Sequence, residues 1–280
     1  MLRSMHDLKS YGIRASDGDI GHVKDFYFGD QEWVVRYLVV DTSVWLPNRK
    51  VLISPMSIDR PDWQDKVLPV SITKEQVRNS PDIDTDEPVS RQEEAGYFRY
   101  YGYPYYGGGS ELWGANAYPY MTPTKWEHGQ PESAPYKRDA TGRTALPEPE
   151  SEPGDRHLRS CKEVIGYRID ATDGDIGHVD DLLVDEDTWA IRYLIVKTGN
   201  WWDGREVLIV PQWITGVSWD DSRVRVSVTQ QQVRDAPIYS SSEELDRTRE
   251  EAIYKHYGRD GYWDAAARHQ AITPVQKNVL

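Results

Sequence analysis

Two histidines lie next to paired carboxylates in a seven-residue sequence, Asp-Gly-Asp-Ile-Gly-His-Val, that occurs twice in the chain. Imidazole and carboxylate groups are ligands of zinc, and a histidine beside a carboxylate can also relay a proton. A zinc site needs three or four ligands, and each copy offers one histidine with its acidic neighbours. We keep this alternative open. The two candidate sets are His22 with Asp17 and Asp19, and His178 with Asp173 and Asp175.

The same sequence is also typical of a tight structural turn. An Asp-Gly hairpin turn requires backbone conformations that glycine and aspartate tolerate. A glycine inside a strand commonly marks a bend or bulge where a small sheet curls. We favour this interpretation, in which the histidines are ordinary strand residues. The structural turn residues are then Asp17, Gly18, Gly21, Asp173, Gly174 and Gly177.

No catalytic motif is visible elsewhere in the sequence. The chain contains no G-x-S-x-G, G-x-x-x-x-G-K or H-E-x-x-H pattern, so we predict a protein that is not an enzyme and has no cofactor. Its one cysteine, Cys161, excludes an internal disulfide and a cysteine-cluster metal site. Because Met5 occupies the matching position of the other copy, we interpret Cys161 as a small apolar residue.

Two arginines, Arg36 and Arg192, interrupt otherwise apolar runs. A charged group in a buried strand needs a partner, because removing an unpaired charge from water is costly. We expect Asp25 and Asp181, on the neighbouring strands, to form ion pairs with them. The alternative is that the arginines anchor an acidic segment of a partner protein.

Tryptophans recur at the predicted loops and strand starts. Large aromatic side chains can cap the open ends of a barrel that is too small to bury them fully. They can equally form an exposed patch that binds another protein, and two adjacent tryptophans strengthen this second interpretation. Both remain open. The residues are Trp33, Trp45, Trp63, Trp189, Trp201, Trp202 and Trp219.

All these residues belong to a long internal repeat. Residues 2–81 align without a gap with residues 158–237, at an offset of 156, and close to half of the positions are identical. Each copy contains about five short runs rich in β-branched and aromatic residues, separated by turn signals. Each then ends in a helical turn that a threonine could cap. We therefore predict a mainly β fold of two small antiparallel β-barrels in tandem, with short helices after each.

Composition divides the chain into four regions. Residues 1–81 are the first barrel, 82–157 an irregular linker rich in Tyr, Gly and Pro, 158–238 the second barrel, and 239–280 a helical or partly disordered tail. The tyrosines near residue 100 form either a strap packed on their own barrel or a sticky segment that drives association. Residues 250–258 echo 93–100 with a one-residue slip, which predicts a helical tail after each barrel.

The net charge limits the possible partners. A charge of −13 opposes binding to nucleic acid and to anionic membranes. The sequence has no run of about 18 apolar residues, so membrane insertion is not expected. We expect a cytoplasmic protein.

The ordered elements resemble the PRC-barrel family, which includes the β-barrel domain of the photosynthetic reaction centre H subunit and the C-terminal domain of the ribosome maturation factor RimM. The residues that carry the resemblance are 17–23, 36–40 and 51–55, with 173–179, 192–196 and 207–211 in the second copy. The resemblance implies an adaptor fold that binds other proteins and has no catalytic residues. The resemblance also implies a connection, at the level of the family, with the photosynthetic reaction centre.

We therefore predict a non-enzymatic adaptor or assembly protein with an unknown protein partner. The two barrels could pack about a pseudo-twofold axis as an intramolecular pseudo-dimer. One alternative is a small-molecule or metal-binding module that uses the Asp/His turns or a cleft between the barrels. Another is a stress-response factor whose tyrosine-rich segment drives association.

Overall fold

The structure is a computed structural model that describes most of the chain. The described residues are 1–46, 49–81, 89, 91–104, 106, 111–121, 157–199 and 204–264. By its internal contacts the chain divides into two compact units, Met1–Ile165 with Asp181–Tyr193, and Gly166–Asp180 with Leu194–Leu280. The residues of the second sequence copy are therefore shared between the two units.

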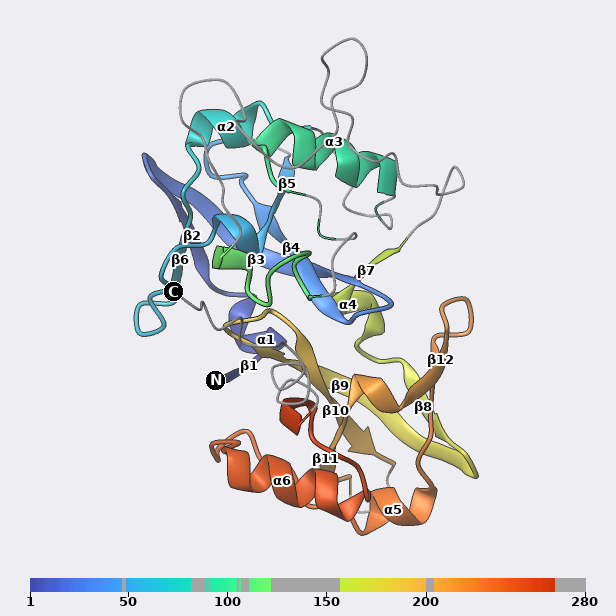
Figure 1. Cartoon of the computed structure of the whole chain (residues 1–280). Coiled ribbons are helices and arrows are strands. Elements are labelled where there is room, and N and C mark those ends of the chain that lie inside the picture. Colours follow the sequence, from blue (N-terminus) through green and yellow to red (C-terminus); the bar gives the residue numbers. More distant parts are fainter. Residues whose placement is uncertain are drawn as a thin grey trace, which may run out of the picture. The chain divides into compact units, whose positions relative to one another are not determined.

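The first copy and the segment after it form short strands and helices (Figure 1). The strands are β1 (Leu2–Ser4), β2 (Gly12–Ala15), β3 (Gly18–Gly29), β4 (Val34–Asp41), β5 (Lys50–Ile53) and β6 (Val67–Pro69). The helices are α1 (Met5–Leu8), η1 (Pro55–Ser57), α2 (Lys74–Arg78), α3 (Arg91–Tyr101) and η2 (Pro119–Met121).

The second copy repeats this order, and most of its elements begin 156 residues after their counterparts. The strands are β7 (Leu158–Ser160), β8 (Arg168–Ala171), β9 (Gly174–Asp185), β10 (Ile191–Thr198), β11 (Glu206–Ile209), β12 (Ile214–Ser218) and β13 (Arg223–Val226). The helices are α4 (Cys161–Val164), η4 (Pro211–Trp213), α5 (Gln230–Arg234) and α6 (Arg247–His256).

The strands form two sheets, which confirms the prediction of a mainly β fold. One has the order β5-β4-β3-β2-β6 with β7 beside β3, and the other has the order β11-β10-β9-β8-β13-β12 with β1 beside β9. The chain passes from β11 at one end of its sheet to β12 at the other, and four residues separate them. So short a connection requires the sheet to curl. One pair in each sheet, β2 with β6 and β8 with β13, is parallel, not antiparallel as predicted.

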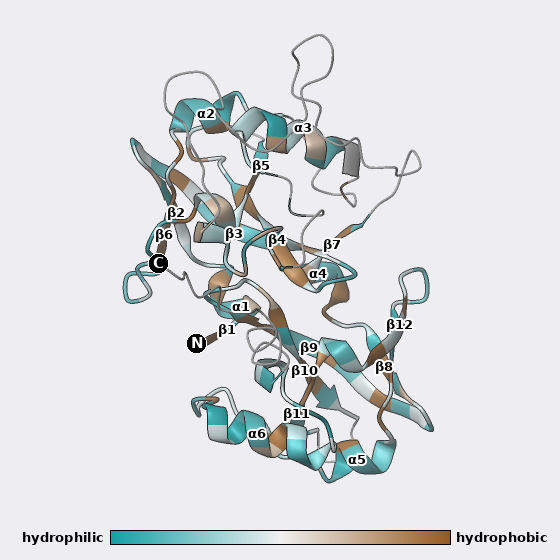
Figure 2. Ribbon diagram, viewed as in Figure 1, coloured by the Kyte–Doolittle hydropathy of each residue, from teal (hydrophilic) through white to brown (hydrophobic). Residues whose placement is uncertain are grey.

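Strands β3 and β4 supply much of the core of the first unit. Every residue of β4 from Val34 to Val40 is buried, and so are Phe26 and Phe28 of β3. A strand that is covered on both faces has a continuous apolar run in place of alternation. Figure 2 shows hydrophobic colour along β4 and hydrophilic colour on α2 and α5.

Short helices follow the last strand of each copy, as predicted. Thr73 accepts a hydrogen bond from the backbone N–H of Gln76 at 3.1 Å, and the Gln76 side chain accepts one from the N–H of Thr73 at 2.7 Å. Thr229 and Gln232 form the same capping box at the start of α5. These reciprocal bonds satisfy donors that the first helical turn leaves free.

Helices α3 and α6 are the predicted helical tails, and their buried positions match at the offset of 156. The sequence inference of a one-residue slip between these tails is therefore wrong. The reason is that helical burial follows the face of the helix and not the best local letter match. The matched buried residues are Glu94, Tyr97, Phe98 and Tyr101 in α3, and Glu250, Ile253 and Tyr254 in α6 with Tyr257 at its C-cap.

Lys66 and its equivalent Ser222 are exposed turn residues with φ of 54° and 53°. This conformation costs a non-glycine residue about 1–2 kcal/mol, whereas glycine adopts it freely but loses more chain entropy on folding. We expect Lys66→Gly to raise the free energy of unfolding by about 0.5 kcal/mol, measured by urea denaturation. Asp65→Gly, one residue away at a negative φ, should instead lower it, and equal effects of the two variants would contradict the explanation.

Candidate functional site

The repeated Asp-Gly turn connects each hairpin to the helix that ends its copy. Asp17 Oδ1 accepts a hydrogen bond from the backbone N–H of Lys74 at 2.8 Å, and Asp173 Oδ1 accepts one from Gln230 at 2.7 Å. The glycine that follows each aspartate has a φ of 136° in Gly18 and 145° in Gly174. These carboxylates are thus engaged with backbone donors in the first turn of α2 and α5.

The two histidines do not gather a set of ligands. His22 is half-buried and His178 is exposed, and His178 Nε2 lies 4.0 Å from Asp180 Oδ1. Among the residues that the structure describes, no group of three or more His, Cys, Asp or Glu side chains is placed to hold a metal ion. The described part of the chain therefore gives the metal alternative no geometric support.

Arg36 is buried inside the first unit, with only 2% of its surface exposed. Its guanidinium carbon lies 3.7 Å from the ring centre of Tyr106 and 4.9 Å from that of Trp113, and Nη1 donates to the carbonyl of Leu112 at 2.6 Å. Among the described residues, the carboxylate of Glu32 lies 4.0 Å from Arg36 Nη2. The predicted ion pair with Asp25 does not form, because the aromatic segment after α3 supplies the partners. Arg36 is also not accessible to a partner protein.

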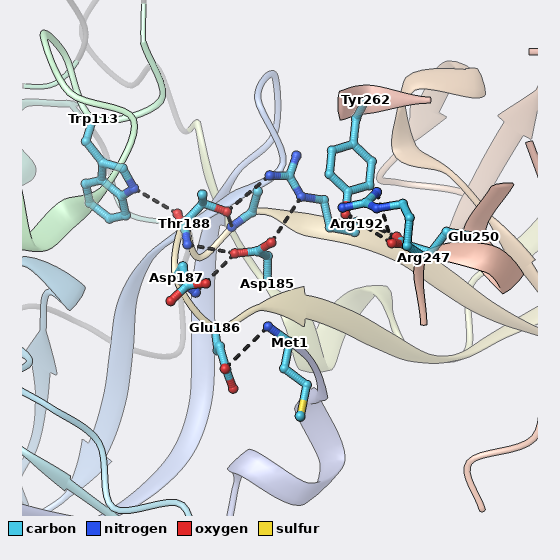
Figure 3. Close-up of polar contacts among 11 residues, drawn as sticks. Met1, Trp113, Asp185, Glu186, Asp187, Thr188, Arg192, Arg247, Glu250 and Tyr262 are labelled. Carbon is cyan, nitrogen blue, oxygen red and sulfur yellow. Dashed lines mark hydrogen bonds and ion pairs between the residues drawn. The ribbon is translucent and has the colours of Figure 1, made fainter. Parts of the chain in front are cut away.

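Arg192 is held by the turn that precedes its strand. Its Nε lies 3.8 Å from Asp185 Oδ2, and its Nη2 donates to Thr188 Oγ1 at 3.3 Å. The indole N–H of Trp113 donates to the Thr188 carbonyl at 2.8 Å, and Figure 3 shows Trp113 and Arg192 reaching Thr188 from two sides. The predicted partner, Asp181, is engaged elsewhere.

The first strand of each sequence copy pairs with the other copy, and both pairings lie in the first unit. Residues 2–4 of β1 pair with residues 183–185 of β9, and residues 158–160 of β7 pair with residues 27–29 of β3. We call these reciprocal pairings the strand clasp. Their registers are identical at the offset of 156, so each copy gives and receives the same strand.

The two aspartates that were expected to pair with arginines serve the strand clasp. Asp181 accepts hydrogen bonds from the hydroxyl of Ser4 and from the backbone N–H of His6. Asp25 accepts equivalent bonds from Ser160 at 2.5 Å and from the backbone N–H of Lys162 at 3.1 Å. Each carboxylate therefore holds the start of the short helix that follows the exchanged strand.

A symmetric backbone contact lies beside the strand clasp. Val34 bridges Ala190, its own equivalent in the other copy. The N–H of Val35 donates to the carbonyl of Trp189 at 2.8 Å, and the N–H of Ile191 donates to the carbonyl of Trp33 at 2.7 Å. A contact in which matching residues meet is the signature of an isologous, twofold interface. Both tryptophans are buried and have positive φ, 55° in Trp33 and 59° in Trp189.

Burial raises the pKa of the Asp181 carboxyl above its ordinary value of 3.8, although the bonds from Ser4, Leu182 and His6 oppose the shift. The folded state then holds this proton more tightly than the unfolded chain does. Stability should therefore fall as pH rises from about 3.8 through the raised pKa. We expect the difference in unfolding free energy between wild type and Asp181→Asn to decrease over that window, measured by urea denaturation at each pH. A flat or rising difference for Asp181→Asn would contradict the assignment.

Cys161 is fully buried next to the strand clasp, and its equivalent Met5 is also fully buried. Burial raises the pKa of the Cys161 thiol well above its usual range. The thiol therefore stays neutral, which agrees with its interpretation as a small apolar residue.

The tryptophans at loop positions differ in their surroundings. Trp63 and Trp219 are half-buried, and the guanidinium of Arg3 lies 4.2 Å from the ring centre of Trp63. Trp201 and Trp202 lie outside the described residues. The paired tryptophans thus remain a prediction.

Trp45 forms the centre of a small surface patch. Its half-buried ring has Lys74 Nζ at 4.7 Å and the guanidinium carbon of Arg78 at 5.5 Å from the ring centre. Its indole N–H donates to the carbonyl of Ile20 at 2.5 Å, which fixes the ring against β3. Tryptophan and arginine are enriched where proteins bind one another. We call Trp45, Lys74 and Arg78 the Trp45 patch, and it is the candidate interaction surface.

The tyrosine-rich segment packs on its own unit where the structure describes it. Tyr97, Tyr101, Tyr103 and Tyr106 are buried. The ring centres of Tyr101 and Tyr103 are 5.4 Å apart in a stacked arrangement. This agrees with the strap interpretation for these residues and leaves them unavailable as a sticky surface.

Sequence reasoning missed a buried polar cluster beneath this strap. Glu94 Oε1 accepts hydrogen bonds from the hydroxyls of Tyr37 at 2.9 Å and Tyr106 at 2.6 Å. His157 Nε2 lies 2.9 Å from Glu94 Oε2. All four side chains are buried. The signal in the sequence was a glutamate on the same helical face as Tyr97 and Tyr101.

The comparison with known families bears on the second copy. Residues 158–233 match the family model of the PRC-barrel domain. Residues 158–233 form a PRC-barrel domain. This PRC-barrel domain runs from β7 into α5, and domains of this family are generally protein-interaction modules. No curated protein gives a significant match to the chain. Among the described residues, no helix combines the length and apolar composition needed to span a membrane.

Proposed function

We propose that this chain is a non-enzymatic adaptor in which both sequence copies are PRC-type barrels that act as one clasped pair to bind another protein. The observation that carries the proposal is the strand clasp. Each copy completes its sheet with a strand from the other, at identical register. A covalently linked pair with a self-complementary interface corresponds to a homodimer on a single chain. The sequence contains no G-x-S-x-G, G-x-x-x-x-G-K or H-E-x-x-H pattern, which supports the non-enzymatic part of the proposal.

The Trp45 patch is the proposed contact with the partner. It presents an aromatic ring and two cations on a chain whose net charge is −13. Trp63 also has an arginine on its ring, but Arg3 is tied to Glu186 by a hydrogen bond of 2.8 Å next to the strand clasp. Trp63 is thus committed within the first unit and serves as a matched control.

The test is site-specific photo-crosslinking in cells that express the whole chain. A benzoylphenylalanine is placed at Trp45 in one variant and at Trp63 in another, and the adducts are identified by mass spectrometry. The proposal predicts one protein captured reproducibly from position 45 and absent from position 63. Capture from position 63 alone, or from neither position, would reject the Trp45 patch as the binding surface.

A further inference from the structure

Helices α3 and α6 differ at one buried position that faces the edge of a sheet. In the first unit Tyr97 is buried, and its hydroxyl donates to the carbonyl of Leu52 in the edge strand β5 at 2.5 Å. The offset of 156 places Ile253 and Leu208 at these positions in the second unit. Isoleucine is shorter than tyrosine and has no hydroxyl, so residue 253 of α6 does not supply the group that fills this place in the first unit.

A cavity of about 210 Å³, partly open to solvent, lies at this position in the second unit. Leu208, Leu245, Ala252 and Ile253 provide apolar walls, and Glu243 and Arg249, which form an ion pair, also line it. An engineered apolar cavity of about 150 Å³ accepts benzene, so this cavity has room for one aromatic ring with small substituents. It is smaller than the roughly 300 Å³ at which pockets for drug-sized ligands begin.

The backbone carbonyl of Leu208 faces this edge of the sheet. Its direction follows from that of Glu206 in the same strand, β11. The carbonyl of Glu206 accepts a hydrogen bond from the N–H of Tyr239 at 2.8 Å and therefore points away from β10. Backbone direction alternates along a strand, so the carbonyl of Leu208, two residues on, points the same way. Its counterpart in the first unit, Leu52, uses that carbonyl to accept the hydroxyl of Tyr97.

We propose that this cavity is a binding site for a phenol. The ring would lie against Leu245, Ala252 and Ile253, and its hydroxyl would donate to the carbonyl of Leu208, as Tyr97 does to Leu52 in the first unit. The phenol can be a small free molecule or the tyrosine side chain of another polypeptide. The inference does not rest on the proposed adaptor function, because a free phenol can occupy the cavity without any protein partner.

The test uses the full chain and three probes: p-cresol, toluene and N-acetyltyrosinamide. We expect p-cresol to saturate one site with a dissociation constant of about 1 mM or tighter, measured by titration with NMR detection. Toluene, which has the ring but no donor, should bind about fivefold more weakly. Binding of N-acetyltyrosinamide as tight as that of p-cresol identifies a tyrosine side chain as an acceptable source, and its exclusion identifies a free phenol.

Two variants assign the site. Ile253→Tyr should fill the cavity with the side chain of the first unit and weaken p-cresol at least tenfold, whereas Ile253→Val should keep the binding. If Ile253→Tyr does not fold, the site is assigned from the NMR chemical-shift changes that p-cresol causes in the wild type. These changes should cluster in β11 and α6. The proposal is overturned by no saturable binding of p-cresol, by equal binding of toluene, by shift changes elsewhere, or by unchanged binding in a folded Ile253→Tyr.

Discussion

Replacing Gly21 or Gly177 with alanine is expected to lower the free energy of unfolding by about 4 kcal/mol or more, enough to prevent soluble accumulation. A Cβ atom at Gly21 would lie 1.9 Å from the carbonyl oxygen of Asp41, and one at Gly177 would lie 2.1 Å from that of Lys197. The obstacle in both cases is backbone, which cannot rotate away as a side chain can. The clash would push the neighbouring strands apart at these positions, and at Gly177 the φ of 136° adds strain for any other residue.

The control is Gly96→Ala in α3. Apart from its chain neighbours and the backbone of its own helix, no atom of the described residues lies within 4 Å of a Cβ built there, and the residue is inside a helix. Alanine should therefore be tolerated and should stabilise the helix by up to about 1 kcal/mol. Solubility and thermal unfolding of the three variants make the comparison. A Gly21→Ala protein that melts close to the temperature of the wild type would contradict the close contact between Gly21 and the carbonyl of Asp41.

Replacing Glu94 with alanine is expected to cost about 3–5 kcal/mol of unfolding free energy. The substitution removes the acceptor for the hydroxyls of Tyr37 and Tyr106 and the partner of His157, and it leaves all three buried. An unpaired buried polar group bears its full desolvation penalty, and three share this one carboxylate. Thermal and urea unfolding of the full chain measure the effect.

Glu93→Gln is the matched control, because it changes a neighbouring, exposed carboxylate on the same helix. It should alter the unfolding free energy by less than about 0.5 kcal/mol. Glu94→Gln should fall between the two, since the amide keeps one acceptor oxygen. Equal unfolding curves for Glu94→Ala and Glu93→Gln would mean that the buried cluster contributes nothing to the fold.

Local features of this fold could be predicted because their causes are local. The Asp-Gly turns, the long apolar run of β4 and the Thr73 cap depend on the conformations and hydrogen bonds of residues close in sequence. The apolar burial of Cys161 followed from the residue at the matching position. For these features the same pattern occurs in both copies, so each copy supports the interpretation of the other.

The strand clasp could not be predicted, because the first strand has the same sequence in both copies. Residues 2–4 and 158–160 are identical, so pairing within a copy and pairing between copies satisfy the same side chains. The exchange then decides where Asp25 and Asp181 lie. The predicted ion pairs with Arg36 and Arg192 failed for this reason, since each carboxylate meets a serine hydroxyl and a helix N-terminus first.

The partners of Arg36 were also beyond reach for a second reason. The two aromatic rings that contact its guanidinium lie 70 or more residues away, in the segment that composition marked as linker. Low-complexity composition indicates a weak tendency to fold alone. Four tyrosines of this segment are nevertheless buried against the first unit, namely Tyr97, Tyr101, Tyr103 and Tyr106. The cavity at Ile253 is similar, because it depends on one residue difference between two helices that only the structure superposes.

The central claim is that the strand clasp joins the two sequence copies independently of the covalent connection. The most direct measurement inserts a protease site within residues 122–156 of the full chain, cuts it, and determines the mass of the product by native mass spectrometry and size-exclusion chromatography. The strand clasp predicts two fragments that remain together, one to one, with the elution volume of the uncut protein. Fragments that separate on cutting, each folded and eluting alone, would contradict it.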